Sequence, residues 1–205
     1  MQHSNMLDKV VDTALELGET TSWESVRLHQ VATHLGVTLE DIHSAVREKE
    51  DIVDAWFDRA DRAMLAVSQR PELQDSDGRF RLVMLIMAWL DALQPYRRVT
   101  RQMILGKLEP GHLHYQVQGA MRVSRTVQWV REAAQHNETL PQRAVGEAVL
   151  TGIYLATFLR WMYDSSPDSQ TTRRFLERKL DVADRLRSWI PGGKRVHAPQ
   201  STPTS

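Results

Sequence analysis

The run from Val26 to Ile52 constrains the fold more than any other part of this 205-residue chain. It reads VRLHQVATHLG, then VTLEDIHSAV, then REKEDI, with apolar residues at helical spacing on both sides of Gly36. We expect Gly36 to end one helix, and Thr38 to cap the next together with Asp41, as in a capping box. Two helices joined by a short glycine turn form a helix-turn-helix, which usually lays its second helix in the major groove of DNA.

The charge distribution of this region argues against DNA binding. Residues 1–60 contain five Lys/Arg and twelve Asp/Glu, a balance of −7, whereas residues 61–205 contain twenty-one and fourteen, a balance of +7. The predicted second helix carries Glu40 and Asp41 and has no basic residue before Arg47. DNA-binding modules normally show the reverse, because Lys and Arg replace the counterions of the phosphates. Two explanations stay open. The charge balance of residues 1–60 hides a small basic patch, or the motif no longer binds DNA.

The rest of the chain also reads as helices, with almost no strand alternation. Apolar spacing and interrupting prolines predict further helices at about residues 5–17, 49–69, 79–93, 97–105, 113–134, 142–163 and 171–190. Gly18 is expected to end the first of these, and Pro71 with LQDSDG to form the clearest loop. The fold class is all-α, with a three-helix helix-turn-helix domain at 1–48, a larger helical domain at 49–190 and a disordered tail at 191–205.

Composition and missing motifs exclude several function classes. The chain has no cysteine, so it can form neither disulfides nor cysteine-based zinc sites. No signal-peptide core and no apolar stretch of ~20 residues is visible, and we expect a cytoplasmic protein. The closest histidine pairs, His112 with His114 and His29 with His34, lack a third ligand, so neither a metal nor a cofactor is expected. Phosphate-binding loops and hydrolase or metalloprotease motifs are missing, so we do not expect an enzyme.

The order of features around the motif resembles a known family. A helix before Gly18, the run LHQVATHLGV, the pair Ile42–His43 and the segment KEDIV are similar to the TetR family of one-component transcriptional regulators, over about residues 5–57. The chain departs from the family at His43, Ala45 and Val46, where Tyr, His and Phe are usual and the Tyr and His commonly touch phosphates. The positions that fit the family pattern are Gly36, Val37, Thr38, Ile42, Lys49 and Glu50.

The resemblance implies a TetR-like fold, with a homodimer formed through the last two helices and a small apolar ligand held in the larger domain. Gly152, Ala156, Phe158 and Leu159 on one of these helices, and Phe175, Leu176 and Leu180 on the other, combine small with large side chains as helix pairing requires. Methionines and tryptophans suit an adaptable apolar cavity, although each alone is equally explained by core packing. The candidate ligand-binding residues are Met64, Met87, Trp89, Met103, Met121, Trp129 and Trp161.

Two functions follow. The first is a TetR-type, ligand-responsive transcriptional regulator that binds DNA as a homodimer, through Arg27, Thr38, Leu39, His43, Arg47 and Lys49. The second is a lipid-binding accessory protein that has kept the fold and lost DNA binding. The segments WFDRADRAML and LTGIYLATFLRWMYDSSPDSQTTRRFLERKLDV resemble the accessory protein family of ubiquinone biosynthesis, which shares the TetR-like fold and binds isoprenoid lipid. The basic segment RRVTRQMILGK could also lie on an anionic membrane, but a half-buried helix with solvated arginines is favoured.

Overall fold

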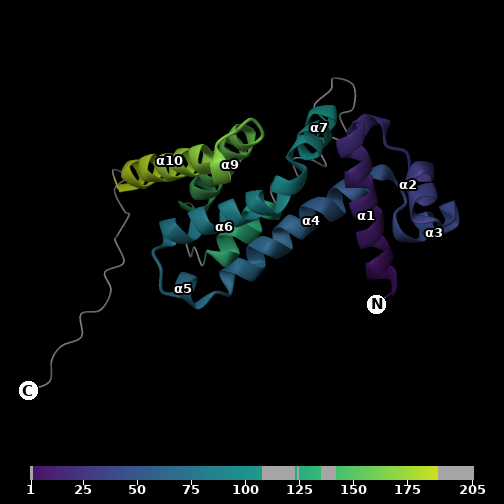
Figure 1. The fold of residues 1–205 in the computed structure, drawn as a ribbon. Coiled ribbons are helices and arrows are strands. Elements are labelled where there is room, and N and C mark those ends of the chain that lie inside the picture. Colours follow the sequence, from purple (N-terminus) through teal and green to yellow (C-terminus); the bar gives the residue numbers. More distant parts are fainter. Residues whose placement is uncertain (1, 108–122, 124, 135–141, 189–205) are drawn as a thin grey trace, which may run out of the picture.

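The computed structural model describes residues 2–107, 123, 125–134 and 142–188. This part of the chain contains helices and no strands, as Figure 1 shows. The elements are α1 (Gln2–Thr20), η1 (Trp23–Ser25), α2 (Leu28–Leu35), α3 (Leu39–Ala45), α4 (Lys49–Ser68), α5 (Pro71–Gln74), α6 (Gly78–Leu93), η2 (Gln94–Tyr96), α7 (Arg97–Lys107), α9 (Gln142–Trp161), η3 (Pro167–Ser169) and α10 (Gln170–Ser188). Residues 125–133 are also helical, whereas the predicted tail at 191–205 lies outside the described residues.

Helices α1, α2 and α3 form a small three-helix core at one end of the molecule (Figure 1). The side chains of Val11 and Leu15 on α1, Val31 on α2 and Ile42 on α3 are all buried there. Trp23 of η1 is buried too, as expected for an aromatic residue that fills the space between short helices. The apolar spacing read from the sequence therefore produces the predicted helix-turn-helix.

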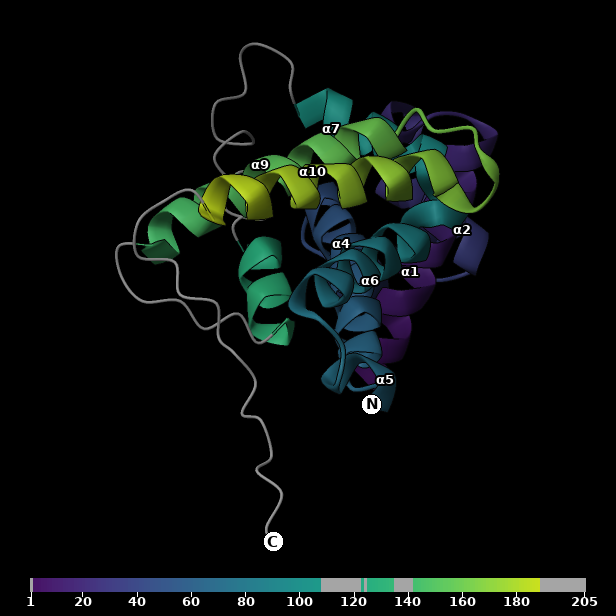
Figure 2. The ribbon, with the colours of Figure 1, turned by 90° about the vertical axis from the view of Figure 1, so that its left-hand side faces the viewer.

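Helix α4 leads from this three-helix core into the larger helical part, where it packs along α6. Both helices bury an apolar face at helical spacing, which is why the sequence predicts their bounds to within one residue. Helices α9 and α10 pair with each other and lie across α6, as the turned view of Figure 2 shows. The helix-turn-helix and the α9–α10 pair therefore lie at opposite ends of the molecule.

The first helix runs past the predicted end at Gly18 and continues to Thr20. Position 18 lies inside the helix, and it is a glycine because α7 passes close to it. A Cβ atom at this position would lie 3.1 Å from Cγ1 of Val99. The helix ends two residues later, where the hydroxyls of Thr20 and Thr21 donate to the carbonyl of Leu17 at 3.0 and 2.8 Å. The glycine marks a close helix crossing instead of a helix end.

Two further predictions in this region were wrong. The expected loop at Pro71 begins with the short helix α5, because proline suits a first helical position and Leu73 is buried against the larger core. The helical spacing of Phe80 with Val83 and Ile86 predicts that Phe80 is buried with them, but its side chain is 50% exposed. It lies in the first turn of α6, before the continuous buried run that begins at Leu82.

Helix α7 connects the two ends of the molecule through neighbouring arginines. Arg98 donates to the backbone carbonyls of Gly18 and Glu19 at the end of α1, and its Nε lies 3.1 Å from Oε2 of Glu19. Arg97 donates to the carbonyls of Trp161 and Asp164, just where α9 ends. Helix α7 is half-buried, as its sequence favoured, but Arg97 and Arg98 are bound to backbone carbonyls and are not solvated as expected.

Candidate functional site

The turn of the helix-turn-helix has the geometry that its sequence predicts. Gly36 adopts φ 66° and ψ 33°, a left-handed conformation that glycine reaches without strain. Its amide donates to the carbonyl of Thr33 at 3.2 Å, and the amide of Val37 donates to the carbonyl of Ala32 at 3.1 Å. These two hydrogen bonds end helix α2 and fix the direction in which the chain enters α3.

Helix α3 opens with the predicted capping box. The amide of Asp41 donates to Oγ1 of Thr38 at 3.1 Å, while Oδ2 of Asp41 accepts from the amide of Thr38 at 2.9 Å and from its hydroxyl at 2.7 Å. These bonds from the Thr38 backbone and hydroxyl lower the pKa of the Asp41 carboxyl. Asp41 is therefore a structural residue of the helix start, and it holds the Thr38 hydroxyl at the same time.

The outward face of α3 carries three exposed side chains. Ile42 and Val46 are buried against the domain core, so the opposite side of the helix faces solvent. Leu39 is 55% exposed, and Glu40 and His43 are exposed beside it. These residues occupy the face that enters the major groove in helix-turn-helix proteins.

The acidic excess of residues 1–60 lies mostly outside this motif. Between residues 27 and 47 there are two arginines, Arg27 and Arg47, and two acids, Glu40 and Asp41, so this stretch is neutral. Other acids are paired elsewhere: Asp8 and Asp12 on α1 both bind Arg59 of α4, at 2.9 Å for the Asp8 pair. The sum over 60 residues therefore overstates the negative charge that DNA would meet at α3.

The three cations predicted to touch DNA have different surroundings. Arg47 is exposed, and its backbone amide donates to Oδ2 of Asp51 at 2.7 Å; among the described residues its guanidinium has no hydrogen bond or ion pair. Arg27 is exposed, and Nη1 of its guanidinium donates to the carbonyls of Glu24 and Val26.

Lys49 differs from the two arginines, because its ammonium group donates to the carbonyl of Trp23 and lies 4.5 Å from the centre of the Trp23 ring. Partial burial and the nearby Arg27 lower the pKa of Lys49. The structure thus brings Arg27, Thr38, Leu39, His43 and Arg47 to the motif surface, while Lys49 points into the domain.

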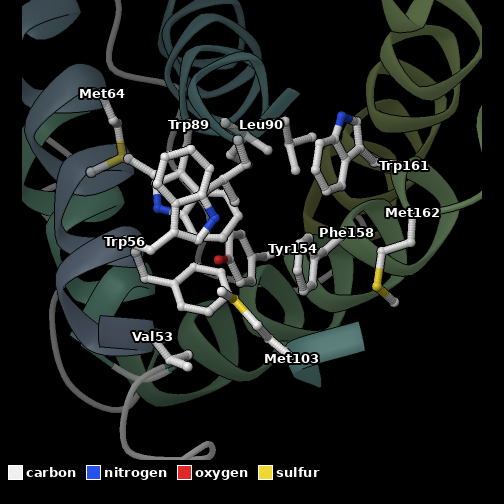
Figure 3. Packing of buried hydrophobic residues seen from close by; sticks show 14 of the residues in the cluster. Val53, Trp56, Met64, Trp89, Leu90, Met103, Tyr154, Phe158, Trp161 and Met162 are labelled. Atoms are coloured by element: carbon white, nitrogen blue, oxygen red, sulfur yellow. The ribbon is translucent and has the colours of Figure 1, made fainter. Parts of the chain in front are cut away.

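Most of the residues predicted to bind a ligand lie in one buried cluster. Figure 3 shows Met64, Trp89, Met103 and Trp161 close together, and Met87 is buried in the same core. Trp129 is 46% exposed and lies apart from these buried side chains, and Met121 lies outside the described residues.

Aromatic rings that sequence reasoning missed complete this cluster. The ring of Trp89 stacks on Phe57 at 5.7 Å and meets Tyr154 and Phe158 edge-on at 5.4 and 5.5 Å. Such edge-on and stacked pairs stabilise a core beyond simple burial. The aromatic part of this interior comes from α4, α6 and α9 together. That these side chains bind a ligand stays a prediction.

A buried carboxylate in this core was also missed. Asp61 is 8% exposed, and its Oδ1 accepts from the Trp89 indole at 2.7 Å and from the Thr126 hydroxyl at 3.1 Å. The sequence does indicate that Asp61 is buried, because the helical spacing of α4 places it on the inward face between Phe57 and Met64. A polar residue at a core position in an apolar helix marks a specific buried interaction.

Two surface grooves lie away from this cluster. One, of about 790 Å³, lies between the end of α6 and the start of α10 and is lined by charged and amide groups that include Asp91 and Arg173. The second, of about 400 Å³, is lined by the corner after α9 and includes Arg160 and Asp164. Neither groove includes a predicted ligand-binding residue.

The described ranges contain neither a metal-binding cluster nor a helix that could span a membrane. In residues 2–107, 123, 125–134 and 142–188, no group of three or more His, Asp or Glu is placed to hold a metal ion. Within the same part of the chain, no helix has the length and hydropathy needed to cross a bilayer.

Helix α9 exposes a continuous apolar strip. Leu155 and Leu159 are 38% and 51% exposed, and the small residues Gly152 and Ala156 lie on the same face. The strip consists of Ala148, Val149, Gly152, Leu155, Ala156, Leu159 and Tyr163, and Val182 and Leu186 of α10 are exposed as well. Phe158, Leu176 and Leu180, predicted to join the subunit interface, are buried in the chain's own core. They take the inner side of each helix because the aromatic cluster and α6 occupy that side.

The fold and this site define an all-helical protein with an N-terminal helix-turn-helix and a larger helical body. The crystal structure of the TetR transcriptional regulator from Nitrosomonas europaea is similar to this chain, with 50% sequence identity and a TM-score of 0.80. The match covers 89% of this chain and 99% of that chain, and the chain therefore belongs to the TetR family. A family model described as COQ9 matches residues 147–187, which span most of α9 and α10. Comparison with curated proteins gave no match.

Proposed function

We propose that this chain is a ligand-responsive transcriptional regulator that binds DNA as a homodimer and has no enzymatic activity of its own. The observation that carries the proposal is the complete helix-turn-helix, with a fixed turn, a capped α3 and an outward face that nothing in the described chain covers. The 50% identity to a TetR transcriptional regulator supports the same reading. Arg27 and Arg47 lie near the two ends of the motif, where they can contact phosphates on either side of the groove.

The dimer follows from the exposed strip on α9. An exposed apolar surface of this kind marks an interaction site in a soluble protein. Gly152 and Ala156 let a second helix approach closely, and Leu155 and Leu159 supply the apolar contact. A twofold axis through such a strip brings α9 and α10 of two subunits into a four-helix interface and presents two α3 helices to a palindromic site.

The ligand would enter the aromatic core between α4, α6 and α9. The lining is apolar, with Asp61 and its hydrogen bonds to Trp89 and Thr126 as its polar part. An apolar lining with few polar groups is typical of small-molecule sites. A ligand that displaced the rings of Trp89 and Phe158 would move α4 and α9, the helices that lead to the DNA-binding core and to the second subunit.

DNA binding is tested by titrating mixed duplex fragments at several salt concentrations. With Arg27 and Arg47 as the phosphate contacts, the slope of log K against log salt should be near ~−2 per subunit, because each contact contributes ~0.9. Glu40→Lys should raise non-specific affinity, whereas Glu16→Lys, an equal charge change on the exposed side of α1, should raise it less. Absence of wild-type binding at low salt would refute the proposal.

A second candidate function is the binding of an isoprenoid lipid without DNA. The match of residues 147–187 to the COQ9 model favours it, since these residues form one wall of the aromatic core. An isoprenoid added at ~100 times its Kd should stabilise the folded protein by ~2.7 kcal/mol. Lipid stabilisation in a protein that binds no DNA at low salt would establish this candidate in place of the regulator.

A further inference from the structure

Helix α3 begins with two acidic side chains, and only Asp41 is used inside the domain. Its carboxylate accepts from the amide and the hydroxyl of Thr38, which turns it back toward the start of the helix. Glu40 is exposed, and within the described part of the chain it makes no hydrogen bond or ion pair. The capping box accounts for Asp41. Glu40 is also favoured in the first turn of α3 by the helix dipole, and its exposed carboxylate can bind a group outside the chain.

Glu40 lies at the middle of the outward face of α3. Successive residues of a helix are ~100° apart, so Glu40 projects ~160° away from the buried Ile42. His43 and Ser44 lie on either side of it, and the Ser44 hydroxyl is already donated to the carbonyl of Asp41 at 2.7 Å. In a helix-turn-helix this central line faces the base edges, whereas the two flanks face the phosphate strands.

A carboxylate in the major groove has few possible partners, because it accepts hydrogen bonds and donates none. Guanine presents two acceptors there, and thymine presents an acceptor and a methyl group, so both repel it. Adenine presents an amino donor, but with the N7 acceptor beside it. Cytosine presents its N4 amino group as a donor with no acceptor beside it.

We propose that Glu40 reads a cytosine in each half-site of the operator and is a specificity-determining residue of this regulator. The inference rests on the proposed function, because it requires that α3 enters DNA. It also explains the acidic start of α3, which otherwise opposes DNA binding. The neutral balance of residues 27–47 makes one central carboxylate tolerable, since Arg27 and Arg47 face the phosphates from the ends of the motif.

The test is a selection of bound duplexes from a randomised library by four proteins: wild type, Glu40→Ala, Glu40→Gln and Glu16→Gln. Wild type should select a C·G pair at one position of each half-site, with roughly tenfold to hundredfold discrimination, as single mismatches usually cost. Glu40→Ala should lose this preference, and Glu40→Gln should shift it to A·T, because an amide pairs with adenine N6 and N7. Glu16→Gln removes the same charge from exposed α1 and should leave the preference unchanged.

The outcomes separate this inference from the proposed function. If wild type selects a defined operator and both Glu40 variants select the same bases at every position, the cytosine contact is refuted while the regulator stands. If wild type selects no sequence and binds no DNA at low salt, the proposed function fails and the inference fails with it. Melting curves of all four proteins should coincide, since both substituted positions are exposed.

Discussion

At the scale of single residues, Asp164 is a strongly held carboxylate at the corner between α9 and α10. Oδ1 accepts from the amide and hydroxyl of Ser166 at 2.8 and 2.6 Å, and Oδ2 accepts from the amide and hydroxyl of Thr172 at 2.8 and 2.6 Å. Burial opposes ionisation, but these four bonds outweigh it and lower the pKa of Asp164 from 3.8 to about 2. The carboxylate therefore favours the folded state only while it is ionised.

We predict that Asp164→Asn lowers the free energy of unfolding at pH 7 by about 2 kcal/mol, the equivalent of nearly two pKa units. Because the pKa is lower in the folded state, the wild-type contribution is complete above pH ~4 and is lost as the pH falls toward 2. Urea titrations at pH 7 and pH 3 measure both effects, and the difference between the proteins should shrink at pH 3. Asp168→Asn is the control, since that side chain is exposed. Equal stabilities of wild type and Asp164→Asn at pH 7 would contradict the assignment.

Lys49, which was predicted to contact DNA, binds inside the domain instead. We predict that Lys49→Met lowers the free energy of unfolding by about 1–2 kcal/mol, because the bond to the Trp23 carbonyl and the ring contact are lost. The salt slope of DNA binding should stay the same. Arg47→Met should do the reverse, with unchanged stability and a slope reduced by ~0.9. Thermal melts and salt titrations of the two variants decide between these roles.

Interactions between residues close in the sequence could be predicted, whereas interactions between residues far apart in the sequence could not. The turn at Gly36 and the Thr38–Asp41 cap involve residues at most five apart, so the sequence contains the whole interaction. The bond from Lys49 to Trp23 joins residues 26 apart, and no spacing rule predicts it.

At the scale of elements, α7 holds the end of α1 through Arg98. A helix end leaves backbone carbonyls without helical partners, and a cation placed there is stabilising. We predict that Arg98→Ala exposes the carbonyls of Gly18 and Glu19 and makes amide exchange in the last turn of α1 at least about tenfold faster. Arg101→Ala is the matched control on the same helix, since Arg101 lies over the ring of Tyr163, away from α1. Equal exchange in both variants would show that α1 is held by packing alone.

Elements with a strong apolar repeat were predicted almost to the residue, as α4 and α6 show. The errors came from contacts between elements. Gly18 looked like a helix end because glycine is usually one, and only the nearness of Val99 explains a glycine inside α1. Phe80 continues the apolar repeat of α6, but the packing neighbours begin one turn later.

At the scale of the whole molecule, the strip on α9 predicts the oligomeric state. We predict that wild type is a dimer and that Leu159→Glu shifts it to monomer, because a carboxylate would be buried unpaired in an apolar interface. Phe80→Glu is the control, since Phe80 is 50% exposed and lies outside the strip. Light scattering after size separation measures both masses. A monomeric wild type at micromolar concentration would rule out the interface.

Helix α9 presents apolar residues on both sides, with Tyr154 and Phe158 inward and Leu155 and Leu159 outward. In the proposed dimer, a second chain covers the outward apolar surface of this helix. Melting temperature should then rise with protein concentration, because association removes folded monomers from the unfolding equilibrium. A cell that makes little of this protein would hold it in a less stable form, and the amount synthesised would set how long each copy persists.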